Sequence, residues 1–91
     1  MKIIILVPIY NDWQSASKLL EEINSNIAGL ECEFSVIIVN DASSEQQSIS
    51  VLNTENLQSI KIMNMNENRG HARCIAIGLK HIFEKEEFDY V

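Results

Sequence analysis

Two short runs of β-branched and aliphatic residues constrain the fold of this chain most strongly. Residues 2–7 and 34–39 are almost entirely apolar, and each run stops abruptly at polar residues. A continuous apolar run of this length is typical of a parallel strand that helices cover on both faces. The pattern therefore predicts an α/β sheet rather than an antiparallel sheet with one face in water.

Helical periodicity follows the predicted strands. Apolar residues recur every three or four positions from Ala16 to Ile27, after Asn11 or Asp12 as the capping residue. Gly29 is predicted to end this helix. A second apolar face extends from Ala72 to Phe83, which predicts a helix in the last third of the chain.

Weaker patterns complete the predicted order. Ser44 and Gln47 have the spacing of a capping box and predict a short helix. Ile60 and Ile62 flank a lysine and predict a third strand, and residues 90–91 begin a fourth. The resulting order is βαβαβαβ. Right-handed crossovers then predict a Rossmann-like, open, mostly parallel α/β sheet with the strand order 3-2-1-4.

Length and charge exclude several classes of protein. With 91 residues, the chain forms one small domain at most. A net charge of -6 without a Lys/Arg cluster argues against a nucleic-acid partner. The longest apolar run is far below the ~20 residues that span a bilayer. Cys32 and Cys74 lack C-x-x-C spacing, so free thiols in a reducing cytosol are expected.

Polar residues follow the two strongest strands and precede the last helix. The sequence reads VPIYND at residues 7–12, VNDAS at residues 39–43 and NRGHAR at residues 68–73. The carboxyl ends of parallel strands meet at one edge of a sheet, where α/β folds bind their ligands. These three segments are therefore expected to gather at one binding edge.

Together with Ala76 and Gly78-Leu79, these segments resemble the opening of a family 2 glycosyltransferase of the GT-A fold. The resemblance covers essentially the whole chain. It implies that residues 1–91 are the donor-binding half of such a domain, with a UDP-sugar or GDP-sugar as the donor. The D-x-D motif that holds Mg²⁺ or Mn²⁺ in the family, and the catalytic base, would follow Val91. We therefore expect no catalytic residue, no bound metal and no turnover from these residues alone.

The resemblance also assigns substrate-binding residues. Pro8, Tyr10 and Asp12 would border the nucleotide, and Asp41 would accept a hydrogen bond from a base N–H or a ribose hydroxyl. Asp41 follows a buried strand, which favours this role on physical grounds as well. The alternative is that Asp12 and Asp41 merely cap the helices that follow them.

Three positions depart from the family pattern. Asp12 stands where the family more often has Glu, Asn40 replaces the usual first Asp, and Ala42 replaces the usual Gly. This places any requirement for two carboxylates in doubt. Gly70 would allow the backbone to approach a diphosphate at a helix N-terminus, and Arg73 could reach the same diphosphate. Alternatively, Gly70 only makes a turn and Arg73 is a solvated surface residue.

Two other functions compete with glycosyl transfer. One is a stand-alone nucleotide-binding or interaction module without catalysis. The other is a nucleotidyltransferase, which should have a Gly-rich basic loop after the first strand, where this chain has PIYN. We expect the protein in the cytoplasm, either free or on the cytoplasmic face of a membrane through parts not present here. A partial sheet leaves an edge and apolar helix faces uncovered, so a homo-oligomer is expected.

Overall fold

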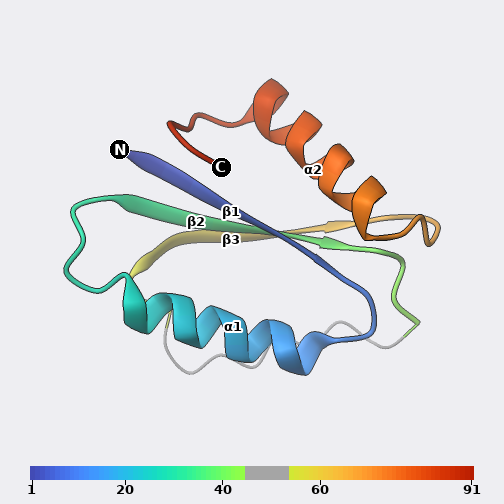
Figure 1. The fold of residues 1–91 in the computed structure, drawn as a ribbon, viewed down its shortest axis with the longest axis horizontal. Coiled ribbons are helices and arrows are strands. Elements are labelled where there is room, and N and C mark those ends of the chain that lie inside the picture. The colour runs from blue at the N-terminus through green and yellow to red at the C-terminus, as the bar shows by residue number, and fades with distance from the viewer. Residues whose placement is uncertain (45–53) are drawn as a thin grey trace.

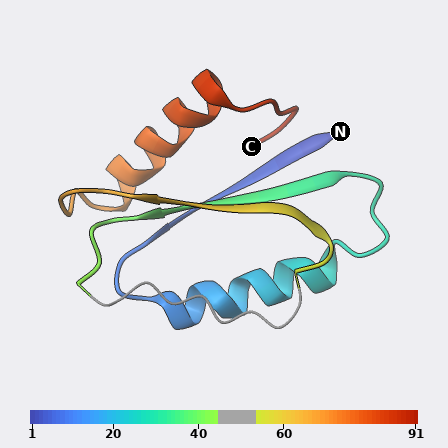
Figure 2. The same cartoon turned by 180° about the vertical axis from the view of Figure 1, so that it is seen from behind.

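A computed structural model describes residues 1–44 and 54–91, and these residues form one sheet between two helices (Figure 1). The elements in chain order are β1 (Lys2–Ile9), α1 (Trp13–Asn26), β2 (Glu33–Asn40), β3 (Leu57–Asn64) and α2 (His71–Lys85). Helix α1 covers one face of the sheet and α2 the other, as the reverse view also shows (Figure 2). The short helix predicted from Ser44 and Gln47 falls almost wholly outside the described residues.

The described strands are parallel and lie in the order β1-β2-β3. On the other side of β1, Tyr90 forms a parallel bridge with Ile3. The backbone N–H of Ile4 donates to the Tyr90 carbonyl at 2.9 Å, and the Tyr90 N–H donates to the Lys2 carbonyl at 3.2 Å. Tyr90 thus occupies the place that the sequence predicted for the fourth strand, and the open parallel sheet is confirmed.

Strand β1 continues through Pro8 to Ile9, beyond the run 2–7 from which the sequence predicted the strand. The carbonyl of Ile9 accepts a hydrogen bond from the N–H of Asp41 in the direction of β2. Alternate residues of a strand bond to opposite sides, so the nitrogen of Pro8 faces the outer side of β1, as the N–H of Ile4 does. Proline therefore removes no hydrogen bond between β1 and β2.

Strand β2 is buried on both faces, as its apolar run predicted. Its residues from Val36 to Val39 are at most 1% exposed. On the α1 side, the cluster of buried residues contains Ile9, Trp13, Ala16, Leu20, Ile27, Val36, Ile38 and Leu57. On the α2 side, Ile4, Ile37 and Ile82 form a second cluster. Burial of these two faces fixes the middle strand, and with it the polar residues that follow.

Helix α1 ends at Asn26, and the N–H of Ile27 makes the last helical hydrogen bond, to the carbonyl of Ile23 at 3.0 Å. Gly29 was predicted to end the helix and instead lies in the turn that follows. Its φ of +84° is in the left-handed region, and the N–H of Leu30 donates to the Ile27 carbonyl across the turn. Gly29 thus adopts the left-handed conformation that glycine tolerates, but it lies one position farther from the end of the helix than predicted.

Two contacts hold α2 against the sheet. Gly78 is buried, and a Cβ atom there would lie 2.6 Å from Cδ1 of Leu6. Beyond the end of the helix, Nζ of Lys61 on β3 lies 2.8 Å from both carboxylate oxygens of Glu86. The Lys61 ammonium is the main reason that the pKa of the Glu86 carboxyl is below its ordinary value. These contacts hold the middle of α2 and the segment just after it close to the sheet.

Candidate functional site

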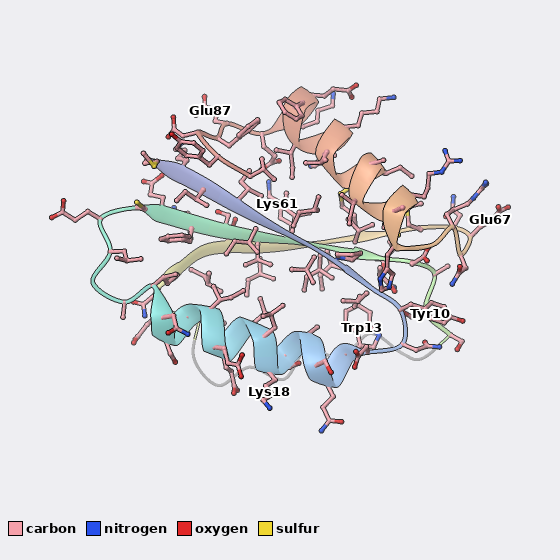
Figure 3. All side chains as sticks on the ribbon, in the orientation of Figure 1. Tyr10, Trp13, Lys18, Lys61, Glu67 and Glu87 are labelled. Carbon is pink, nitrogen blue, oxygen red and sulfur yellow. The ribbon has the colours of Figure 1, made fainter. Side chains whose placement is uncertain are left out.

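The three polar segments gather at one edge of the sheet, as predicted. The last residues of the strands are in register, since Ile9 is paired with Asn40, and Asn40 with Asn64. Figure 3 shows Tyr10, after β1, and Glu67, after β3, at the same end of the molecule, with Glu87 at the opposite end. The loops after β1, β2 and β3 therefore share one surface.

Asn11 connects the loop after β1 with the loop after β2. Its backbone N–H donates to Oγ of Ser43 at 2.8 Å, and its side-chain Nδ2 donates to Oγ of Ser44 at 3.0 Å. Asn11 has a φ of +52°, a conformation that asparagine tolerates better than most residues. Two hydrogen bonds thus fix the position of the loop that carries Tyr10.

Asn40 connects the loop after β2 with the end of β3. Its Oδ1 accepts the backbone N–H of Ser43 at 3.1 Å and also the Ser43 hydroxyl. Its Nδ2 donates to Oδ1 of Asn64 at 3.0 Å, and its carbonyl accepts the N–H of Met65 at 2.9 Å. The neutral amide of Asn40 therefore both accepts and donates: its Oδ1 bonds to the loop after β2, and its Nδ2 bonds to the end of β3.

Asp41 is only 1% exposed and bonds to the backbone before α2. Oδ1 accepts the N–H of Arg69 at 2.7 Å, and Oδ2 accepts the N–H of Gly70 at 2.9 Å. The Arg69 N–H is the main reason that the pKa of the Asp41 carboxyl lies below its ordinary value; the Gly70 N–H and the Cys74 thiol lower it further, against the opposing effect of burial. Each oxygen of Asp41 already accepts one backbone N–H, so a donor group of a ligand could bond only to the lone pairs that are left on this buried carboxylate.

Asp41 also accepts the N–H of Gly70, the residue at which a diphosphate was expected to approach the helix N-terminus. Gly70 is the N-cap residue of α2, and its carbonyl accepts the N–H of Cys74 at 3.1 Å. The positive end of the α2 dipole thus already faces a carboxylate. Burial and the neighbouring Asp41 raise the pKa of the Cys74 thiol to about 11, which keeps the thiol protonated and able to donate to that carboxylate.

A pocket of about 460 Å³ lies between the end of β3 and α2. It is lined by Asn64, Met65, Asn66, Glu67, Arg69, Arg73 and Ile77. Nη2 of Arg69 lies 2.7 Å from Oε2 of Glu67, and both side chains are more than half exposed. Arg73 is exposed as well and makes no ion pair with the described residues. The guanidinium of Arg73 could therefore bind an anion in this pocket.

The residues predicted after β1 form a separate group. Tyr10 is 43% exposed, Pro8 is half-buried, and Asp12 is exposed. Asp12 is the N-cap residue of α1, but its side chain makes no capping hydrogen bond. Within residues 1–44 and 54–91, no hydrogen bond joins these three residues to Gly70 or Arg73. Among the described residues, the structure thus brings Asp41 and Gly70 into contact, whereas the carboxylate of Asp12 does not cap α1.

The family model described as Glycosyl transferase family 2 matches residues 4–86. This chain belongs to glycosyl transferase family 2. The match confirms the resemblance read from the three polar segments, and it assigns the chain to a family that carries out glycosyl transfer. No solved structure matches the chain.

The described part of this family 2 domain does not form a metal site. No group of three or more His, Cys, Asp or Glu side chains lies within residues 1–44 and 54–91 in an arrangement that could hold a metal ion. Asp41, the buried carboxylate at this edge, directs its oxygens at two backbone N–H groups. These residues therefore do not fit a divalent ion.

Sequence reasoning missed several residues of this family 2 edge. Asn11, Ser43, Asn64 and Arg69 were not predicted as site residues, yet they hold the loops together or line the pocket. One signal was present in the sequence: Asn40 follows the strand predicted over 34–39, and Asn64 follows the strand predicted from Ile60 and Ile62. Parallel strands in register place such residues side by side.

Proposed function

We propose that the shared edge binds the nucleotide diphosphate of a sugar donor, with a UDP-sugar or a GDP-sugar as the donor class. The observation that carries this proposal is the hydrogen-bonded convergence of the three loops after β1, β2 and β3 in a family 2 domain. A binding surface that is held in place before the ligand arrives loses less entropy on binding.

The exposed side chains supply the proposed contacts. The ring of Tyr10 offers a face on which a base can stack. The carboxylate of Asp12 can accept a hydrogen bond from a ribose hydroxyl, since it is not used as a helix cap. Arg73 is the proposed partner of the diphosphate. Asp41 contributes by holding Gly70, so its effect on binding is indirect.

We propose that the transfer step itself needs a divalent ion, Mg²⁺ or Mn²⁺, on carboxylates other than Asp41, and a further carboxylate as the base. This follows the family pattern of a D-x-D motif, and it is supported by the commitment of Asp41 to backbone donors. Residues 1–91 alone are then expected to bind donor without turnover. A turnover assay that detected sugar transfer by this chain would contradict that part.

We also propose that the protein acts in the cytoplasm and that it self-associates. Cys32 and Cys74 are both free, which supports the cytoplasm as the compartment. Within the described residues, no helix has the length and apolar character that crossing a membrane requires. Phe83 and Tyr90 are 70% and 60% exposed, which supports self-association through the outer face of α2 and the segment that follows it.

Isothermal titration of UDP and of GDP into the 91-residue chain tests the nucleotide proposal. We expect wild type to bind one of them, Asp12→Asn and Arg73→Gln to bind it about tenfold more weakly, and Glu84→Gln to bind as wild type does. Glu84 is an exposed residue near the far end of α2 and serves as the matched control. Failure of wild type to bind either nucleotide, or equal affinity in all four proteins, would contradict the proposal.

A further inference from the structure

The side-chain bond between Asn40 and Asn64 has a defined direction. Oδ1 of Asn40 already accepts two donors from Ser43, the backbone N–H at 3.1 Å and the hydroxyl. The amide of Asn40 is therefore turned so that its Nδ2 lies 3.0 Å from Oδ1 of Asn64. Asn64 is the acceptor of this bond, and its own Nδ2 makes no hydrogen bond with the described residues. That nitrogen remains a donor.

Asn64 lines the pocket between β3 and α2 together with Arg69 and Arg73. Each of these three side chains offers N–H groups. The acidic residue of the lining, Glu67, is paired with Arg69 at 2.7 Å. The lining of this pocket consequently includes an asparagine and an arginine that have N–H groups to donate, and groups with several acceptor oxygens and a negative charge match such a surface.

We propose that Asn40 is a positioning residue that acts through Asn64 to make this pocket a binding site for a phosphoryl group. This inference rests on the proposed function, in which the phosphoryl group is the diphosphate of the donor. A carboxylate at position 40 could not donate to Oδ1 of Asn64. It would require a donor from Asn64 instead, and the amide of Asn64 would turn its oxygen toward the pocket. The amide at position 40 therefore decides whether Asn64 attracts or repels an anion.

Titration with inorganic pyrophosphate tests this role directly. We expect wild type to bind pyrophosphate, and Asn40→Asp and Asn64→Leu each to bind it about tenfold more weakly. Because Asn40 acts through Asn64, the double variant should bind about as weakly as Asn64→Leu alone. Gln58→Glu adds the same charge at the opposite end of β3, and it should leave the affinity unchanged.

Thermal unfolding shows whether each variant is folded. If Asn40→Asp does not fold, Asn64→Leu still decides the question, because the inference requires this variant to lose affinity. Unchanged binding in Asn64→Leu, independent and additive effects of the two substitutions, or no pyrophosphate binding by wild type would each overturn the inference. Pyrophosphate binding that depends on Asn40 without any binding of UDP or GDP would overturn the proposed nucleotide site and leave this inference standing.

Discussion

The backbone N–H of Gly70 lies 2.9 Å from Oδ2 of Asp41, and this hydrogen bond joins the end of β2 to the first turn of α2. The two residues are 29 positions apart in the chain. Their contact means that the strand that forms the centre of the sheet also sets where α2 begins. Arg73, one turn into the helix, depends on Asp41 for its place at the binding edge.

Replacing Asp41 with asparagine should lower the stability of the domain. One oxygen would become an NH₂ group that faces a backbone N–H, so one hydrogen bond is lost and two donors are brought together. We expect the Tm to fall by roughly 5–10 °C. Asp12→Asn is the matched control, because Asp12 is exposed and makes no capping bond, and its Tm should equal that of wild type. Equal Tm values for both variants would show that the Asp41 contact contributes nothing.

Acid should destabilise wild type more than Asp41→Asn. The pKa of Asp41 is lowered in the folded protein from an ordinary value of 3.8, chiefly by the Arg69 N–H. A carboxyl with a lowered pKa stabilises the fold above its unfolded pKa, and this contribution is lost as the pH falls through the folded pKa. In urea unfolding from about pH 6 to about pH 2, the free energy of unfolding should therefore fall more steeply for wild type than for Asp41→Asn. The pKa of Glu86 is also lowered, so the part of the acid destabilisation that comes from Glu86 should remain in the variant. Parallel curves of the free energy of unfolding against pH for the two proteins would exclude a contribution from Asp41.

Ala42→Gly should stabilise the domain. Ala42 has a φ of +56°, a conformation that costs a residue with a Cβ atom about 1–2 kcal/mol, and glycine is free of that cost. Since glycine also gains entropy in the unfolded chain, we expect a net gain of about 0.5–1 kcal/mol in the free energy of unfolding. The control is Ala76→Gly in the middle of α2, and this substitution should lower the free energy of unfolding. A loss of stability in Ala42→Gly would show that the left-handed conformation is not strained.

Gly78→Ala should move α2 away from the sheet. The new Cβ would lie 2.6 Å from Cδ1 of Leu6 and 3.1 Å from Cγ2 of Val39. We expect a loss of about 1–2 kcal/mol in the free energy of unfolding, after the better helix propensity of alanine is taken into account.

Leu6→Val provides the internal test of this explanation, because valine has no Cδ atoms. The double variant should be more stable than the two separate effects predict. If the losses in the free energy of unfolding are additive, the contact with Leu6 is not the cause of the destabilisation by Gly78→Ala.

The sequence predicted the architecture well because the relevant signals are local. The buried part of β2 is apolar up to Val39, and the fold places the next residue, Asn40, at the edge where the strand ends. The place of Tyr90 beside Ile3 followed from the handedness of the crossovers. Pro8 was misjudged, since its effect depends on which side of β1 has a neighbour.

The candidate site was less predictable because its partners are distant in the chain. The pattern placed Asp41 correctly at the edge, but a carboxylate after a strand can face a ligand or the protein. Its actual donors, Arg69 and Gly70, come from a loop 28 and 29 residues later. The direction of the amide of Asn40 depends in the same way on the two donors of Ser43. Such choices follow from three-dimensional packing and have no periodic signal.

Pro8 also affects how strongly the sheet can be extended on the side of Tyr90. A chain that runs alongside β1 beyond Tyr90 finds a backbone donor at Leu6, but Pro8 has none to offer. Such a chain could still donate to the carbonyl of Pro8 but could not accept a hydrogen bond from its nitrogen, so its pairing with β1 would be weaker there. The weaker pairing would fall next to the loop that carries Tyr10, whereas on its other side β1 stays paired with β2 as far as Ile9.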